Sequence, residues 1–169
     1  IEEGSVNETL MSMIRANTRL PVDTVGDTYA LIACNEVGCA RLVEMMGEFH
    51  LTDLVELGNY ICDRSEQAVL EEIARLPQGS WTATMVTDGY DEAVNLTATV
   101  TISEAGMHAD FEGSSPMVDR GINVPMAYTT AYTVFGMSCI VAATIPKNAG
   151  SLKPLTVCAP SGCILNAPK

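Results

Sequence analysis

The sequence predicts an α+β fold, in which an N-terminal three-helix unit is followed by an antiparallel sheet with one or two packed helices. Two observations support this prediction. Apolar residues recur at a helical period as far as Pro77, and beyond Gln78 the period falls to that of a strand. We therefore expect a helical layer over residues 1–78 and a segment of antiparallel strands and helix over residues 79–169, as one continuous part of a larger subunit.

Three helices are predicted in the first part of the chain. The first covers about residues 6–18 and ends before Pro21, because proline removes a main-chain donor. The second covers about residues 27–47, and Gly38 inside it indicates close packing against a neighbouring helix. The third covers about residues 53–76 and would be about 36 Å long at a rise of 1.5 Å per residue. We expect the three helices to pack antiparallel to one another.

The second part of the chain has the alternation of strands. Apolar and polar residues alternate on either side of the turn at Asp88 and Gly89, which predicts a hairpin. A further turn at Gly106 returns the chain as a third antiparallel strand. The predicted strands cover residues 81–87, 94–102, 107–112 and 155–158, and the predicted helix covers residues 126–143.

The stretch Ala109–Pro125 is the part of the chain that hydrophobic pattern explains least. A strand leads into it and a helix leads out of it, and turn formers and glycines are dense in between. Loops held between a rigid strand and a helix often contain binding or catalytic groups. On composition alone, the stretch also fits a plain strand-to-helix connection.

Composition limits the function. With 9 basic and 21 acidic residues, the formal charge of -12 argues against a nucleic acid or an anionic membrane as partner. No apolar run reaches the roughly 20 residues of a membrane span. No CxxC spacing occurs, so a metal site is improbable, and we interpret the cysteines as reduced thiols of a cytoplasmic protein. They are Cys34, Cys39, Cys62, Cys139, Cys158 and Cys163, of which Cys34, Cys62 and Cys139 fall in apolar helical stretches and should behave as small hydrophobes.

No complete catalytic motif is found in the sequence. His108 and Asp110 alternate in phase on one strand and should share a face, where they could orient each other or form a plain surface pair. His50 precedes a helix start and is interpreted as a surface residue. No nucleophile elbow, P-loop or GxGxxG motif is present, so we expect no ATP site within this chain.

Short motifs in order nevertheless identify a family resemblance. Arg15–Pro21, Asp110–Pro116, Gly121–Pro125 and Ile145–Gly150 together resemble the hydantoinase B family, and the resemblance covers nearly the whole chain. That family includes the hydrolytic part of 5-oxoprolinases, N-methylhydantoinase B subunits and the related large subunits of acetone and acetophenone carboxylases.

The resemblance implies ATP-dependent hydrolytic ring opening of hydantoin, 5-oxoproline or a similar lactam, together with a hydantoinase A type ATP-binding subunit or domain. It implies ATP on that partner, and a divalent metal held by a GTHLPD-like motif that would lie upstream of Ile1. We therefore expect an internal segment that binds no cofactor and is inactive when isolated. Two alternatives remain open, an ATP-dependent ketone carboxylase subunit and a scaffold or docking domain without catalytic groups.

Three residues are carried over as candidate site residues, while the catalytic residues stay unidentified. Ser114, Ser115 and Asn123 are predicted to line or shape a substrate pocket, chiefly as hydrogen-bonding and backbone-positioning groups. The alternative is a conformational loop without substrate contact. Met117 stands where many relatives have glutamine, which removes an amide from the pocket and weakens an exact substrate assignment.

Overall fold

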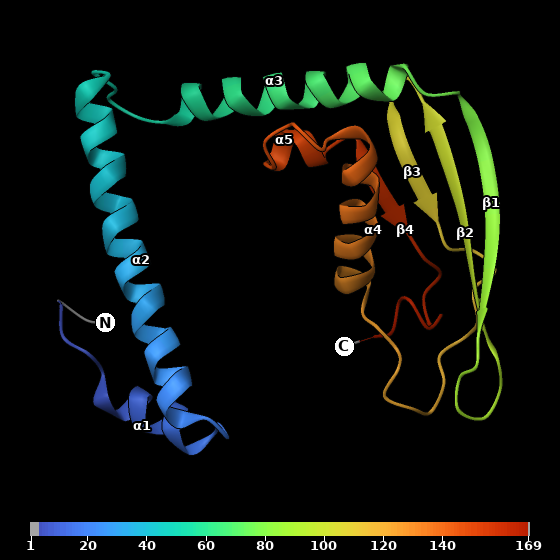
Figure 1. Cartoon of the computed structure of the whole chain (residues 1–169), viewed down its shortest axis with the longest axis horizontal. Coiled ribbons are helices and arrows are strands. Elements are labelled where there is room, and N and C mark those ends of the chain that lie inside the picture. Colours follow the sequence, from blue (N-terminus) through green and yellow to red (C-terminus); the bar gives the residue numbers. More distant parts are fainter. Residues whose placement is uncertain (1–3, 169) are drawn as a thin grey trace. The chain divides into compact units, whose positions relative to one another are not determined.

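The computed structural model describes residues 4–168 and confirms the α+β class (Figure 1). The chain forms two compact units, which divide between Leu54 and Val55. In chain order the elements are α1 (Glu8–Ala16), α2 (Pro21–Glu48), α3 (Val55–Ala74), β1 (Gly79–Thr87), β2 (Val94–Ser103), β3 (Gly106–Asp110), α4 (Met126–Val141), α5 (Ala149–Leu152) and β4 (Leu155–Cys158).

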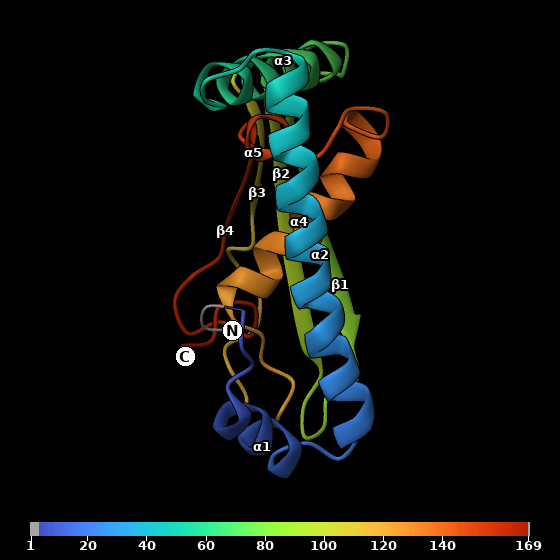
Figure 2. The ribbon, with the colours of Figure 1, turned by 90° about the vertical axis from the view of Figure 1, so that its left-hand side faces the viewer.

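The first unit consists of α1 and α2. Asn7 caps α1, since its side chain accepts a hydrogen bond from the main-chain N–H of Leu10 at 3.0 Å. Pro21 begins α2, rather than only ending the helix before it, because the first helical position needs no N–H donor. Figure 2 shows α1 beside the N-terminal end of α2, where the hydroxyls of Thr18 and Thr24 lie 2.9 Å apart.

Helix α2 has 28 residues and none of them is buried. The expectation that Gly38 marks close helix packing is wrong, because a Cβ built there would meet nothing within 4 Å. Cys34 and Cys139 are exposed, so they do not act as buried hydrophobes. The large apolar side chains that α2 exposes include Val22, Leu31, Val37, Leu42 and Val43.

The second unit contains α3 and the sheet, and here the structure differs from the predicted three-helix unit. Ser65, Val69 and Ile73 are the buried residues of α3, and the latter two belong to the core that the sheet and α4 form. The helical period alone indicates which face of α3 is apolar. It does not indicate which element covers that face.

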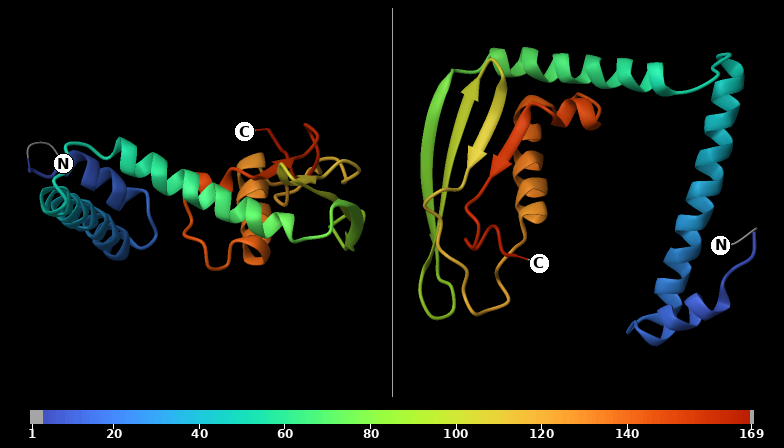
Figure 3. Two further views of the ribbon diagram at one scale, coloured as in Figure 1. Left: turned by 90° about the horizontal axis from the view of Figure 1, so that it is seen from above. Right: turned by 180° about the vertical axis from the view of Figure 1, so that it is seen from behind.

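The sheet has the strand order β1-β2-β3-β4 (Figure 3). The first two pairings are antiparallel, as predicted, but β3 pairs with β4 in parallel, so the sheet is mixed. Parallel neighbours need a long crossover connection, and the chain between β3 and β4, which includes α4 and α5, supplies it. The parallel register places Thr156 beside His108 and Cys158 beside Asp110.

The two faces of the sheet differ in character. The inner face packs against α3 and α4 through a core that contains Met107, Ala109 and Leu155 together with Val69, Ile73, Val134, Met137 and Val141. The outer face has hydroxyl pairs across β1 and β2, at 2.8 Å for Ser80 with Thr101, 2.8 Å for Thr82 with Thr99 and 3.0 Å for Thr84 with Thr97. None of the helices within residues 4–168 combines the length and apolarity that crossing a bilayer requires.

Candidate functional site

The loop after β3 continues the pairing of β2 by means of serine side chains. The Ser114 hydroxyl accepts from the Thr97 N–H and donates to the Thr97 carbonyl, both at 3.0 Å. Ser115 bonds Asn95 in the same way, its Oγ accepting from the N–H at 2.9 Å and its own N–H donating to the carbonyl at 2.8 Å. Both serines therefore take the place of a strand where β3 has ended, and they satisfy main-chain groups of β2 that would otherwise need water.

Asn123 closes the second half of this loop. Its Oδ1 accepts from the Val118 N–H at 2.9 Å, and its Nδ2 donates to the carbonyls of Val118 at 2.7 Å and Arg120 at 3.0 Å. The Arg120 guanidinium donates to both carboxylate oxygens of Asp91 at 3.0 Å, which ties the loop to the connection between β1 and β2. Both donors of the Asn123 amide are thus bonded within the protein.

Two apolar pockets lie where this loop meets the inner face of the sheet. The first has a volume of about 480 Å³, and the loop residues Phe111 and Val124 form part of its wall. The second, of about 450 Å³, is lined by Ile122 and Val124 of the loop and by residues of the β1–β2 turn. Both pockets are also lined by Leu96 and Leu165.

The three predicted residues belong to the loop that borders these pockets but do not line them. None of Ser114, Ser115 and Asn123 is among the lining residues of either pocket, whereas Phe111, Ile122 and Val124 of the same loop are. Each hydroxyl or amide bonds to main chain, so the geometry fits the positioning role. Tyr128 and Tyr132 of α4, whose ring centroids lie 4.5 Å apart, also line the first pocket. Sequence reasoning missed them as site residues, although two aromatic residues one helical turn apart after a polar loop were visible in the pattern.

The last of the four motifs of the resemblance, at residues 145–150, holds α5 against α3. Asn148 caps α5, with its Oδ1 accepting from the Ser151 N–H at 3.0 Å, and its Nδ2 donates to Ser65 Oγ of α3 at 2.8 Å. A Cβ on Gly150 would overlap the main chain of Cys62 in α3, so only glycine permits this approach. This motif therefore has a structural role in the second unit.

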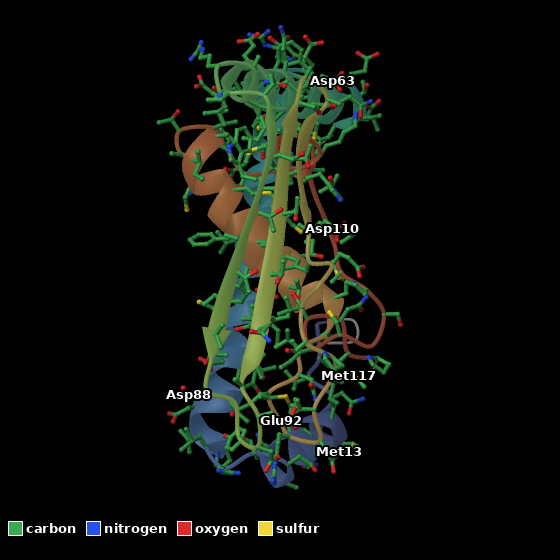
Figure 4. The ribbon with its side chains drawn as sticks, turned by 90° about the vertical axis from the view of Figure 1, so that its right-hand side faces the viewer. Met13, Asp63, Asp88, Glu92, Asp110 and Met117 are labelled. Atoms are coloured by element: carbon green, nitrogen blue, oxygen red, sulfur yellow. The ribbon has the colours of Figure 1, made fainter. Side chains whose placement is uncertain are left out.

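A polar cluster lies on the outer face of the sheet. His108 and Asp110 do share a face, as predicted, and the parallel register adds Cys158 to them. His108 Nε2 lies 3.3 Å from Cys158 Sγ, and His108 Nδ1 lies 2.8 Å from Thr156 Oγ1. The sequence offers no histidine near Cys158, so only the pairing of β3 with β4 reveals this contact. Figure 4 views the sheet from this side and labels Asp110.

Hydrogen bonds and burial shift two pKa values in this cluster. The pKa of Asp110 is lowered, first by the hydrogen bond that its Oδ1 accepts from the Glu112 N–H at 2.9 Å and then by the Cys158 thiol. The pKa of the Cys158 thiol is raised, first by burial and then by Asp110 and Glu112. The cluster therefore contains an ionised carboxylate beside a protonated thiol, which is a poor nucleophile.

The fold and these sites define an α+β segment with an apolar pocket beneath a polar, hydrogen-bonded loop. Residues 1–169, the whole chain, match the sequence profile of the Hydantoinase B/oxoprolinase family. The chain therefore belongs to the hydantoinase B/oxoprolinase family.

Individual relatives agree with the family match. A protein of Pseudomonas sp. (strain NS671) that is provisionally named as the B component of a D-/L-hydantoinase is 26% identical over 179 residues, covering 98% of this chain and 30% of that protein. 5-Oxoprolinase 1 of Arabidopsis thaliana is 28% identical over 162 residues, covering 88% of this chain and 13% of that protein. The crystal structure of ATP-dependent caprolactamase from Pseudomonas jessenii shares the fold, with a TM-score of 0.85 and 23% identity over 99% of this chain and 29% of that one. The chain thus spans less than a third of each.

Proposed function

We propose that the protein containing this chain takes part in the ATP-dependent hydrolytic opening of a cyclic amide such as hydantoin, 5-oxoproline or a similar lactam. The observation that carries the proposal is the match of the whole chain to the family. Relatives named for hydantoinase and 5-oxoprolinase activity, and the fold shared with a caprolactamase, support the same substrate class.

Within that reaction, this chain would supply one wall of a substrate pocket. Small-molecule sites are mostly apolar clefts of about 300–1,000 Å³, and the pocket of about 480 Å³ beside Tyr128 and Val124 falls in that range. An apolar wall suits the methylene part of a small lactam. Ser114, Ser115 and Asn123 would keep the loop that forms the wall in place, because their bonds to main chain fix its course.

The ATP and the metal would be held elsewhere. The sequence contains neither a P-loop nor a GTHLPD-like run, and on that basis we place the ATP and the metal of the reaction outside residues 1–169. A hydantoinase A type subunit or domain would bind ATP and phosphorylate the substrate, and the name of the Pseudomonas relative, as one lettered component of a hydantoinase, supports a partner of this kind. The segment by itself would then be inactive.

The test is a reconstituted assay of the full-length protein that contains this chain, with a hydantoinase A type subunit and ATP. Hydantoin, 5-oxoproline and caprolactam are supplied in turn, and the ring-opened acid and ADP are measured. We expect acid to form only when both proteins and ATP are present. Carboxylation of acetone or acetophenone with bicarbonate would instead identify the ketone carboxylase alternative, and no turnover of either class would support the docking alternative.

A variant pair then tests the pocket. Tyr128→Ala removes an aromatic side chain from the pocket wall, and Tyr60→Ala removes an exposed one from α3 as the control. Loss of roughly 1.4 kcal/mol of apolar contact would raise KM about tenfold for Tyr128→Ala. An equal KM in the two variants would show that this pocket does not bind the substrate.

A further inference from the structure

The strongest unassigned feature of the chain is the polar cluster of His108, Asp110, Cys158 and Thr156 on the outer face of the sheet. Two alternate rows of the parallel pairing bring these side chains together on one face, His108 with Thr156 and Asp110 with Cys158. One nitrogen of His108, the sulfur of Cys158 and a carboxylate oxygen of Asp110 all lie within 4.8 Å of one another. These four residues lie on the opposite face of the sheet from Met107, Ala109 and Leu155, so they are not part of the hydrophobic core.

Thr156 is placed to favour one tautomer of His108. Its hydroxyl lies 2.8 Å from His108 Nδ1 and 3.5 Å from the Met107 carbonyl, so it can accept from Nδ1 while it points its own proton toward Met107. In that arrangement the proton of the neutral imidazole lies on Nδ1. The lone pair lies on Nε2, the nitrogen that faces Cys158 Sγ at 3.3 Å. A hydrogen bond to the second ring nitrogen is the usual way in which proteins orient a histidine that binds a metal.

The charges around the thiol favour a cation. Asp110 is held ionised by the N–H of Glu112, and the Glu112 carboxylate also acts on Cys158. Negative charge next to a thiol opposes a free thiolate and therefore argues against a nucleophilic cysteine. A divalent cation reverses this balance, because it stabilises the thiolate and neutralises the carboxylates at the same time.

We propose that His108 Nε2, Cys158 Sγ and a carboxylate oxygen of Asp110 bind a divalent metal ion of borderline softness, with zinc as the best match. Nitrogen, thiolate and carboxylate ligands together are typical of zinc sites. Tetrahedral zinc with bonds of about 2.3 Å to sulfur and about 2.0 Å to nitrogen places those two atoms about 3.5 Å apart. The observed 3.3 Å is close to that spacing. Three protein ligands leave the fourth position to water, and the thiol proton passes to solvent when the metal binds.

Cobalt(II) is the probe for this site, because a cobalt–thiolate bond gives a charge-transfer band that His and Asp ligands alone do not produce. The band is titrated in metal-free protein, and zinc is then added in competition. We expect one equivalent of cobalt to produce the band and zinc to displace it. Binding should tighten as the pH rises, since a proton is released. Because the band reports cysteine ligation, a His and Asp metal site elsewhere in the protein would not contribute to it.

Variants assign the ligands. Cys158→Ser should abolish the band, His108→Gln should weaken cobalt binding at least tenfold, and Cys139→Ser is the control because it removes an exposed thiol from α4. Thr156→Val leaves the ligands intact and should weaken binding by about 10 to 100-fold through the lost support of His108. Near-ultraviolet circular dichroism checks that each variant is folded. The absence of the band in wild type, or its survival in folded Cys158→Ser, would overturn the proposal. Neither result depends on the proposed amide hydrolysis.

Discussion

Replacing Gly150 with alanine tests whether the turn at residues 146–150 fixes α5 to α3. The added Cβ would meet the main chain of Cys62, at 2.5 Å from its carbonyl carbon and 2.7 Å from its Cα, with the carbonyl oxygen closer still. These atoms belong to the main chain of a helix, so they cannot turn aside as a flexible side chain would. Either α5 or α3 has to move.

The expected loss of free energy of unfolding follows from the contacts that a movement of α5 or α3 would disturb. Overpacking in a well-packed region costs about 1–3 kcal/mol. Moving α5 also strains the bond from Asn148 Nδ2 to the buried Ser65 Oγ, which contributes about 1 kcal/mol. Alanine regains up to about 1 kcal/mol over glycine in a helix. We expect Gly150→Ala to lower the free energy of unfolding by roughly 1–3 kcal/mol.

The assay is urea unfolding of residues 1–169 followed by the fluorescence of Trp81, the single tryptophan of the sequence, which lies on β1 of the second unit. Gly136→Ala is the matched control, since Gly136 lies inside α4 and a Cβ there would meet nothing within 4 Å. The control should be neutral or stabilising by up to about 1 kcal/mol. A Gly150→Ala protein that unfolds at the same urea concentration as Gly136→Ala would refute the reasoning.

Three further predictions concern the loop and the outer face. Asn123→Ala removes three hydrogen bonds to main chain, so the Val118 amide should exchange with solvent at least tenfold faster, as measured by hydrogen exchange. The lowered pKa of Asp110 stabilises the folded protein above the ordinary carboxyl pKa of about 3.9, and this stabilisation is lost as the pH falls through the pKa of the folded state. Asp110→Asn should therefore be less stable than wild type at neutral pH and as stable as wild type in strong acid. The midpoints of urea unfolding measure both differences. Because the pKa of Cys158 is raised, iodoacetamide should alkylate Cys158 more slowly than the exposed Cys139 in metal-free protein. Peptide mass analysis measures the two alkylation rates, and equal rates would contradict the prediction.

The local part of the fold could be predicted from the sequence. The alternation between residues 94 and 102 and the turn at Asp88 and Gly89 predict β2 and its hairpin with β1, because both signals are short in range. The strand at Leu155–Cys158 was also predicted with its observed bounds. Its partner was not, because a parallel pairing forms across a long crossover and leaves no mark on the spacing of nearby residues.

In the candidate site, too, the short-range features could be predicted from the sequence and the long-range contacts could not. The loop from Ala109 to Pro125 is found from its turn formers alone, and the hydrogen bonds that fix its course are made within a few residues or to the adjacent strand. The contact of Cys158 with His108 depends on the β3–β4 register, which the spacing of cysteines along the chain does not reveal. Sequence separation is a poor guide to side chains that a sheet brings together from distant strands.

Two of the four motifs that carry the resemblance, at residues 110–116 and 145–150, have the same physical role in this chain. Ser114 supplies β2 with the partner that β3 no longer provides, and Asn148 supplies both a cap for α5 and a bond to α3. Each holds irregular chain in place by bonds to the protein itself. A loss of activity on mutating either residue would therefore report first on the position of the loop, and only a change in KM or kcat at unchanged stability would assign a direct role in the reaction.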